Sequence, residues 1–481
     1  MLWLALRFPR LPLEIFTRGM AISGSLAVVS SSATNAEIVV CNQEARRHGI
    51  DTGMPVVMAW ALASGLRVFT RDAPAEHAAL ERAAAWALQF TPTVSIATST
   101  EILLEVEGSL RFFGGLNRLW TEIKRKTGAT GYTVNMAGAP TPLAAQLFAR
   151  AGLPPRIRHG DALRLSLGQL PVSVLELSPA LSDLLRDIGI RTLGECLELP
   201  RDGLARRAGR ELLAQLDRAF GDVPDPRPAF VPPQNFKATL SLPAPVESAE
   251  MLLFAARRLI AELCGLLAAI GKGAQRLKFL LLHENGHETR LSLNLVAASR
   301  DPAHLTSVLR ERLERARLPS PAITMTLESE RLQPLSSSNL AFLPDERQQT
   351  EALARLIERL RARLGETAVQ GLDAVADHRP ERAWHACEPG NGDGTWITWR
   401  PSARPLWLLN TPRPLTQIRE TPQHEGPLTL LTMPERIESG WWDGDDVRRD
   451  YFVARDPAES LLWIYREHRA NGGWYLHGYF S

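Results

Sequence analysis

The sequence has few of the residues that build metal sites or disulfide frameworks. Its four cysteines are scattered along 481 residues, and no two of them form a CxxC pair. Zinc-type spacing is therefore absent, and a chain of this length has no need of disulfides to hold its fold. We expect reduced thiols and no metal at Cys41, Cys196, Cys264 and Cys387.

Long apolar runs and strong net charge are also missing. No run approaches the 18–20 apolar residues that cross a bilayer, and Met1–Leu13 is interrupted by Arg7, Pro9, Arg10 and Pro12. We therefore predict a cytoplasmic protein without membrane contact. The net charge is only +2, so any surface that binds nucleic acid must be local.

Length and pattern predict several domains, because the chain is too long for one hydrophobic core. The first part mixes strands and helices as an α+β domain does, the second has short helices broken by glycines, and the last is rich in tryptophan and short strands. The predicted divisions are 1–166, 167–232, 235–332, 333–375 and 376–481.

Residues 235–332 predict a βαββαβ unit of ferredoxin-like topology. Two alternating strands flank the turn signal Asn285-Gly286, and their polar residues fall on one face. Residues 252–320 hold eleven Lys and Arg against six Asp and Glu, which suits a phosphate backbone. A merely solvated outer face is the alternative. The candidate DNA-binding residues are Arg276, Lys278, Arg290 and Asn294.

The segment Asn42–Pro55, NQEARRHGIDTGMP, resembles the fingers motif of Y-family translesion DNA polymerases. Thr100–Gly108, TEILLEVEG, is similar to a palm strand of the same family, and the likeness extends over roughly residues 1–330. The resemblance implies palm and fingers in 1–166 (fingers about 26–75), a thumb in 167–232 and a little finger in 235–332. It also places Gln43 and Arg46 beside the phosphates of an incoming nucleotide.

The positions that carry catalysis in that family are altered here. Nucleotidyl transfer uses two divalent ions held by carboxylates, and magnesium prefers such oxygen ligands. By the resemblance, the two aspartates of the first palm strand become Ala5 and Arg7, and the aromatic residue that screens the sugar becomes Arg10. The Asp-Glu pair of the second strand becomes Thr100-Glu101. We therefore expect no catalytic residues, no bound metal and no cofactor.

A degenerate palm, a little finger and a tryptophan-rich end together resemble the ImuB-type subunits of the bacterial mutasome. Pro434–Gly444 and Gly473–Phe480 look like the terminal module of that type. The resemblance implies an adaptor induced by DNA damage, whose partners are DNA, the sliding clamp, an ImuA-like RecA-related protein and an error-prone C-family DNA polymerase. The candidate partner-binding residues are Trp441, Trp442, Trp463 and Trp474.

A candidate clamp-binding peptide follows the little finger. Sliding clamps accept short extended peptides with a polar head and two apolar plugs. Asn339–Leu343, NLAFL, fits this form with Asn339 as the head and Leu340, Phe342 and Leu343 as the plugs. A linker that packs on its own domain is the alternative.

Two other functions remain open from the sequence. The first is an active Y-family polymerase that draws replacement carboxylates from Glu14 or Glu105. The second is a DNA-binding repair protein that acts without the clamp. Primer extension separates the first from an adaptor, and capture of the clamp separates the second.

Overall fold

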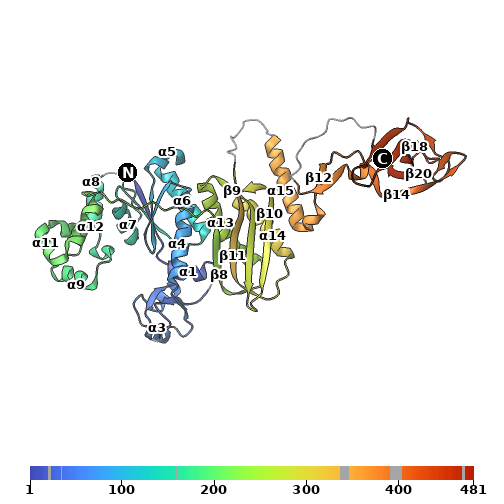
Figure 1. Cartoon of the computed structure of the whole chain (residues 1–481). Coiled ribbons are helices and arrows are strands. Elements are labelled where there is room, and N and C mark those ends of the chain that lie inside the picture. The colour runs from blue at the N-terminus through green and yellow to red at the C-terminus, as the bar shows by residue number, and fades with distance from the viewer. Residues whose placement is uncertain are drawn as a thin grey trace. The chain divides into compact units, whose positions relative to one another are not determined.

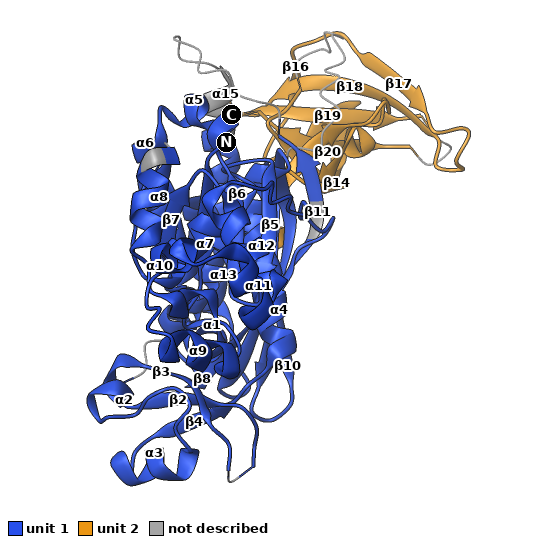
Figure 2. Ribbon diagram, turned by 90° about the vertical axis from the view of Figure 1, so that its left-hand side faces the viewer, with its two compact units in different colours: residues 1–363 blue, residues 364–481 orange. Residues whose placement is uncertain are grey.

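The chain folds into two compact units, residues 1–363 and 364–481 (Figure 2). This computed structural model describes residues 1–19, 23–33, 35–157, 160–335, 346–389, 404–468 and 472–480. None of the helices within those ranges is long and apolar enough to cross a membrane.

An antiparallel sheet of order β5-β6-β1-β7 forms the centre of the first unit. Alternate residues of β1 enter different cores, because successive strand side chains point to opposite faces. Leu2, Leu4 and Leu6 face helices α4 and α6, whereas Trp3 and Ala5 face α7. The bounds are Trp3–Arg7 (β1), Thr93–Thr98 (β5), Glu101–Glu105 (β6), Asn135–Ala139 (β7), Ala73–Ala87 (α4), Leu116–Thr130 (α6) and Pro142–Arg150 (α7).

The fingers-like segment is a small sheet of order β3-β2-β4 with two short helices. Asn42 organises it: the side-chain oxygen accepts hydrogen bonds from the N–H groups of Ala45 (2.9 Å) and Leu26 (3.1 Å), and the amide donates to the Gly24 carbonyl (2.7 Å). This cap explains the predicted helix after Asn42. The bounds are Leu26–Val29 (β2), Ile38–Cys41 (β3), Arg67–Thr70 (β4), Gln43–Arg47 (α2) and Val56–Leu62 (α3); α1, Leu11–Thr17, links this sheet to β1.

Short helices follow, as the glycine pattern predicts. Gly189 (φ +82°) lies in the turn between α9 and α10, a left-handed conformation that costs glycine little. These helices share one core with α7 and the inner face of the palm sheet. The bounds are Gly160–Gly168 (α8), Val172–Leu175 (η2), Pro179–Asp187 (α9), Leu193–Glu198 (α10), Arg201–Ala208 (α11) and Arg210–Phe220 (α12).

The predicted βαββαβ order of elements is present, but the strand order is β10-β9-β11-β8. The second and fourth strands of the unit are therefore central, whereas a ferredoxin-like sheet has its first and third strands there, so the expected topology is wrong although the layers are correct. The helices α13 and α14 cover one face of this sheet and bury its apolar side chains. The opposite face holds the polar residues. The bounds are Lys237–Val246 (β8), Ala249–Ala269 (α13), Lys272–His283 (β9), Glu288–Ser299 (β10), Pro302–Arg315 (α14) and Ala322–Pro334 (β11).

Helix α13 lies beside α4 and α6 of the palm (Figure 1). Its Glu262 is 1% exposed and pairs with the equally buried Arg18, and it also accepts a hydrogen bond from Arg82 (3.2 Å). The guanidinium of Arg18 lies 4.4 Å from the ring centroid of Tyr132, and burial raises the pKa of Tyr132 to about 12. A buried carboxylate held by two guanidinium groups fixes the docking geometry, because either charge left alone would be costly.

Helix α15, Glu346–Leu364, attaches to the little finger more closely than a linker would. Glu358 is buried, accepts a hydrogen bond from the Val296 N–H (2.7 Å) and lies 2.6 Å from the His304 imidazole. Residues 333–375, predicted as a linker with one helix, are thus divided. Most of the helix belongs to the first unit, and the chain from Leu364 onward belongs to the second.

The second unit is a β-rich module, as predicted. Its main sheet has the order β15-β14-β20-β19-β18-β16, with β17 paired to β18, and a two-stranded sheet joins β12 to β13. Stacked aromatic rings fill one of its two cores: the centroids of Tyr451 and Trp463 are 4.2 Å apart. The bounds are Gly371–Ala374 (β12), Trp384–Cys387 (β13), Trp407–Ile418 (β14), Thr421–Gln423 (β15), Thr429–Leu430 (β16), Glu435–Ser439 (β17), Val447–Arg455 (β18), Leu461–Glu467 (β19) and Trp474–Tyr479 (β20).

Gly265 sets how closely α13 approaches α4. A Cβ at this position would lie 2.2 Å from Cδ1 of Trp86, so Gly265→Ala should lower the free energy of unfolding by about 1–3 kcal/mol, as overpacking does. Gly128→Ala on α6 is the matched control. No atom would crowd its Cβ, and alanine there should stabilise the helix by about 0.5–1 kcal/mol. Denaturant unfolding measures both, and equal stability of the two variants would contradict the close packing.

Candidate functional site

Three of the four positions that the resemblance aligns with catalytic carboxylates, Arg7, Thr100 and Glu101, lie at one end of the palm sheet. The β1–β6 register sets Arg7 opposite Glu101, and Thr100 directly precedes β6. Ala5 pairs instead with Leu103 and is fully buried in an apolar core. Of the two predicted positions on β1, the structure therefore brings only Arg7 to Glu101.

Glu101 is bound on both carboxylate oxygens. Arg150 donates from Nε to Oε1 (2.7 Å) and from Nη2 to Oε2 (2.9 Å), and Gln146 donates to Oε2 (2.8 Å). The carboxylate is only 1% exposed. Burial acts to raise the pKa of Glu101, but the hydrogen bonds and charge of Arg150, with Gln146 and Arg7, outweigh it and hold the pKa below its usual value.

Arg7 extends this network toward the thumb-like helices. Its Nε lies 3.7 Å from Oε1 of Glu101, its Nη1 donates to the Arg150 carbonyl (3.1 Å), and its Nη2 donates to Glu176 (3.3 Å). Arg150 also donates to the Val174 carbonyl (3.2 Å). Glu176 follows η2 with φ +54°, an uncommon conformation for a residue other than glycine. The network therefore ties the palm sheet to the start of the helical domain.

These residues do not fit a pair of magnesium ions. A magnesium site needs free carboxylate oxygens, whereas both oxygens of Glu101 accept from Arg150. The guanidinium of Arg7 adds a repelling charge beside the same carboxylate.

The two replacement carboxylates lie elsewhere. Glu14 accepts hydrogen bonds from the Thr133 N–H (3.0 Å to each oxygen), and its pKa is raised, chiefly by burial. Glu105 pairs with Trp3, four residues along β6 from Glu101, which is a separation of about 13 Å. Neither carboxylate joins Glu101 in a shared site.

The predicted nucleotide-pocket residues divide between two elements. Gln43 and Arg46 are exposed on α2 of the fingers-like segment. Arg10 is partly buried at the start of α1, close enough to Glu14 to lower the pKa of that carboxyl against the larger effect of burial. Arg10 therefore lies near Glu14, and within the described residues no contact joins it to Gln43 or Arg46.

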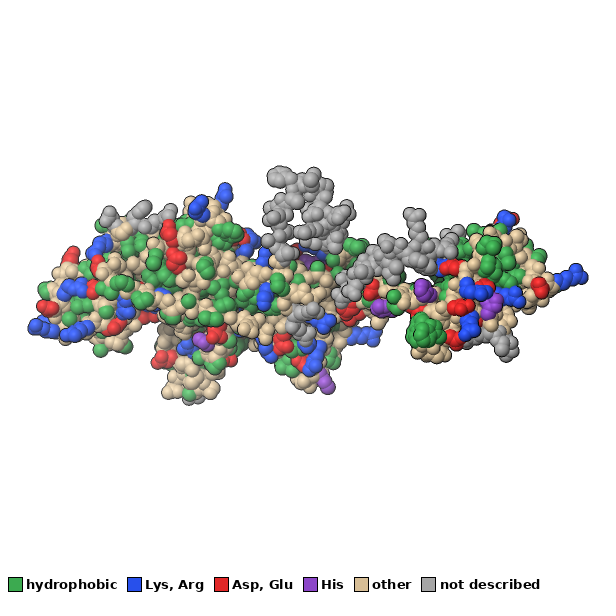
Figure 3. Space-filling view, turned by 45° about the horizontal axis from the view of Figure 1, so that its top comes forward, with side chains coloured by type: hydrophobic (Ala, Val, Ile, Leu, Met, Phe, Trp, Pro, Cys, Tyr) green, Lys and Arg blue, Asp and Glu red, His purple; other side chains and the backbone are tan. Residues whose placement is uncertain are grey.

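The four candidate DNA-binding residues share the open face of the little-finger sheet. Opposite pairs are Arg276 with Asn294 and Lys278 with Ser292, and Arg290 lies opposite Leu280 on the same face. Arg276 and Arg290 are exposed, while Lys278 and Asn294 are half-buried. Charges of both signs are mixed on the face of the molecule that Figure 3 shows. The alternation predicted from the sequence is therefore correct.

The four candidate tryptophans of the second unit divide into two kinds. Trp463 and Trp474 are buried in its cores, at 2% and 6% exposed, so packing within the module accounts for them. Trp441 and Trp442 are 80% and 58% exposed and contact each other edge to face. The candidate clamp peptide, Asn339–Leu343, lies outside the described residues.

The ordered loop that carries the exposed pair is held by Arg379. This guanidinium is 2% exposed, donates to Asp443 (2.6 Å) and Asp377 (2.7 Å), and donates to the Asp445 carbonyl (2.9 Å). It also lies 5.8 Å from the ring centroid of Trp442. The aromatic pair is therefore presented on a fixed support.

Sequence reasoning missed three members of the palm network, Gln146, Arg150 and Glu176. The first two are four residues apart on α7, so they share a helix face, and that spacing was a usable signal. Glu176 has no such signal, because only the packing of η2 against the palm brings it to Arg7.

Comparison with known proteins defines the class of this chain. Residues 17–150 match the model of the impB/mucB/samB family. DNA polymerase IV of Desulfatibacillum aliphaticivorans is 25% identical over 216 residues, which cover 44% of this chain and 54% of that protein. The chain thus has a Y-family polymerase-like fold of the α+β class with an extra β-rich C-terminal module, as predicted.

A particular relative matches nearly the whole chain. Protein ImuB of Caulobacter vibrioides is 27% identical over 461 residues, which cover 90% of this chain and all of that protein. The chain is therefore a homologue of ImuB, and the predicted resemblance is confirmed.

The solved structures that this chain matches include an insertion ternary complex of Dbh DNA polymerase and DinB from Sulfolobus solfataricus. Each is 18% identical with a TM-score of 0.41. The first match covers 70% of this chain and all of the solved chain, and the second covers 69% and 98%.

Replacing Glu101 by glutamine should weaken the fold in a pH-dependent way. At pH 7 the variant should lose about 2–3 kcal/mol of unfolding free energy, the range for charged hydrogen bonds. Because the folded-state pKa of Glu101 lies below its ordinary 4.5, its contribution is complete above pH 4.5 and is lost as the pH falls through the lowered value. Urea unfolding between pH 7 and pH 3 measures how the difference in unfolding free energy between wild type and variant decreases with pH.

Glu122→Gln is the control for this titration. Glu122 pairs with Arg125 on an exposed helix face, and such pairs contribute about 1 kcal/mol or less. If the difference in unfolding free energy between wild type and Glu101→Gln stays constant down to pH 3, Glu101 does not take part in a stabilising ion pair.

Proposed function

We propose that this protein is a non-catalytic, DNA-binding adaptor of translesion synthesis induced by DNA damage. The observation that carries the proposal is the neutralised palm: Arg7 and Arg150 surround the carboxylate that a polymerase would offer to metal. The homology to ImuB and the match to the impB/mucB/samB model support a role in translesion synthesis.

The lack of catalysis follows from the cost of freeing Glu101. A metal ion would have to displace two charged hydrogen bonds and leave Arg150, which is 10% exposed, without its partner. Removing one member of a buried ion pair typically costs about 3–5 kcal/mol. An active polymerase with Glu14 or Glu105 as ligand is the second candidate, and their separate positions speak against it.

DNA is the proposed ligand of the open little-finger face. Arg276, Lys278 and Arg290 supply positive charge there, which Glu288 beside Arg290 and Glu328 opposite Lys278 partly offset. Ser292 and Asn294 supply hydrogen-bonding groups on the same face. Such a surface contacts phosphate and sugar rather than base edges, so it should bind without strong sequence preference.

We further propose the partners that the ImuB resemblance implies. The peptide Asn339–Leu343 would bind the sliding clamp. The pair Trp441–Trp442 would contact an ImuA-like RecA-related protein or an error-prone C-family polymerase, because exposed tryptophans on a fixed loop make good interface anchors. These partners act on chromosomal DNA, so the proposed location is the cytoplasm, without a membrane partner.

Purified protein should bind a primed DNA template but should not extend the primer with magnesium or manganese. Lys278→Gln/Arg290→Gln should weaken binding and lower the slope of log affinity against log salt by about 2, one for each phosphate contact. Arg448→Gln/Arg455→Gln in the second unit changes net charge equally and should leave binding unaltered. Extension that disappears in Glu101→Ala would establish an active polymerase instead.

The clamp and the recruited polymerase should depend on different segments. Leu340→Ala/Phe342→Ala should abolish capture of the sliding clamp and keep capture of the polymerase partner. Trp441→Ala/Trp442→Ala should abolish capture of the polymerase partner and keep capture of the clamp. Pull-down with each purified partner measures this. Wild-type protein that fails to capture the clamp would favour a DNA-binding repair protein that acts without it.

A further inference from the structure

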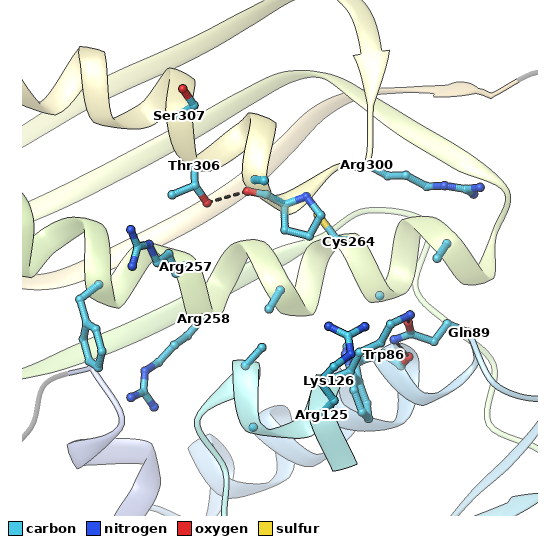
Figure 4. A pocket seen from close by; sticks show the side chains of 18 of the residues that line it. Trp86, Gln89, Arg125, Lys126, Arg257, Arg258, Cys264, Arg300, Thr306 and Ser307 are labelled. Atoms are coloured by element: carbon cyan, nitrogen blue, oxygen red, sulfur yellow. Dashed lines mark hydrogen bonds between the residues drawn. The ribbon is translucent and has the colours of Figure 1, made fainter. Parts of the chain in front are cut away.

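A groove of about 1050 Å³ lies between the palm and the little finger (Figure 4). The helices α4 and α6 form one side, and α13 with the start of α14 forms the other. Since α13 and α14 cover the apolar face of the little-finger sheet, the groove is on the opposite side from the proposed DNA-binding face.

Positive charge dominates this groove. Six arginine and lysine residues line it and no aspartate or glutamate does. Glu122 partly neutralises two of the six, at 2.7 Å from Arg125 and 3.4 Å from Lys126. Within the described part of the chain, the other four form no ion pair with a carboxylate. They are Arg257, Arg258, Arg300 and Arg310.

Arg258 is held in place, and the nearby charge of Glu14 only partly offsets its own. Its guanidinium lies 4.7 Å from the ring centroid of Phe254. It also fills the space beside Gly131, because a Cβ added to that glycine would lie only 1.5 Å from Nη1 of Arg258. Burial, together with the charge of Arg18, lowers the pKa of Arg258. A bound anion would offset this unfavourable environment, which is a physical reason for an anionic ligand.

The shape of the groove suits a single strand. Small residues such as Gly128, Ala129 and Ala261 line its wall and let a ligand backbone approach. Arg310 lies on α14 and Arg300 lies just before the first residue of that helix, so the two guanidinium groups line the same wall at different points along it. Phe254 is 42% exposed and lines the groove, and Arg258 lies over its ring, so a base could stack only on the face of the ring that Arg258 leaves open. The volume is that of a large small-molecule site and does not accommodate a duplex.

We propose that this groove binds the sugar-phosphate backbone of single-stranded nucleic acid, separately from the little-finger sheet face. Arg257, Arg258 and Arg310 contact phosphates, and Phe254 stacks a base. The inference extends the proposed function, since an adaptor at a primed template meets both duplex and unpaired strand. An acidic polypeptide is the competing ligand, and the test includes it.

The test compares the affinity of full-length protein for a fluorescent oligothymidylate of twelve nucleotides with its affinity for a blunt duplex of equal length. Arg257→Gln/Arg310→Gln should weaken binding of the single strand and reduce its salt slope by about 1.4, which is 0.7 for each lost phosphate contact. Duplex binding should not change. Both side chains are exposed on helices and glutamine is a good helix former, so thermal unfolding should match wild type.

Two further variants separate the possible outcomes. Lys278→Gln/Arg290→Gln should weaken duplex binding and leave the salt slope of single-strand binding unchanged. The proposals for the two surfaces are therefore tested independently. Arg448→Gln/Arg455→Gln, with the same change in charge, should affect neither ligand. An unchanged single-strand slope in Arg257→Gln/Arg310→Gln overturns the proposal. The proposal is also overturned if the protein binds labelled oligoglutamate but not oligothymidylate and the two substitutions abolish the binding of oligoglutamate.

Discussion

The bidentate ion pair between Glu101 and Arg150 determines what the palm can do. It satisfies both carboxylate oxygens inside a buried site, and Arg7 adds a second guanidinium from the neighbouring strand. The same groups reach Glu176 and the Val174 carbonyl, so the pair also joins the sheet to the helical domain. The ion pair therefore has a structural role in the palm, and a carboxylate whose two oxygens accept hydrogen bonds from guanidinium groups is a poor metal ligand.

A second buried carboxylate, Glu262, fixes the little finger by the same principle. Arg18 and Arg82 hold it from the palm side, and Gly265 allows α13 to approach Trp86 closely. Docking through helices leaves the polar sheet face open and creates the basic groove behind it. One packing arrangement therefore produces both of the surfaces for which we propose nucleic-acid ligands.

The second unit shows how one residue type serves two purposes. Trp463 and Trp474 bury their rings within the module, whereas Trp441 and Trp442 stay exposed on a loop that Arg379 ties to three aspartate residues. A large aromatic surface held in place loses little conformational entropy on binding, so a partner gains most of the burial energy. Composition alone did not distinguish these roles, because both pairs lie in similar short segments.

The sequence by itself determined the local structure: the cap at Asn42, the hairpin at Asn285-Gly286 and the alternation that places Arg276 and Lys278 on one face. These follow from turn chemistry and strand periodicity, which act over a few residues. The resemblance of the sequence to Y-family polymerases also led to the expectation that Arg7 stands at a carboxylate position. Only the tertiary structure decided that Arg150 and Glu176 complete that site, that Trp463 is core, and that Arg257 and Arg310 line one groove. Contacts between residues far apart in sequence depend on how helices and sheets pack, and no local pattern encodes that geometry.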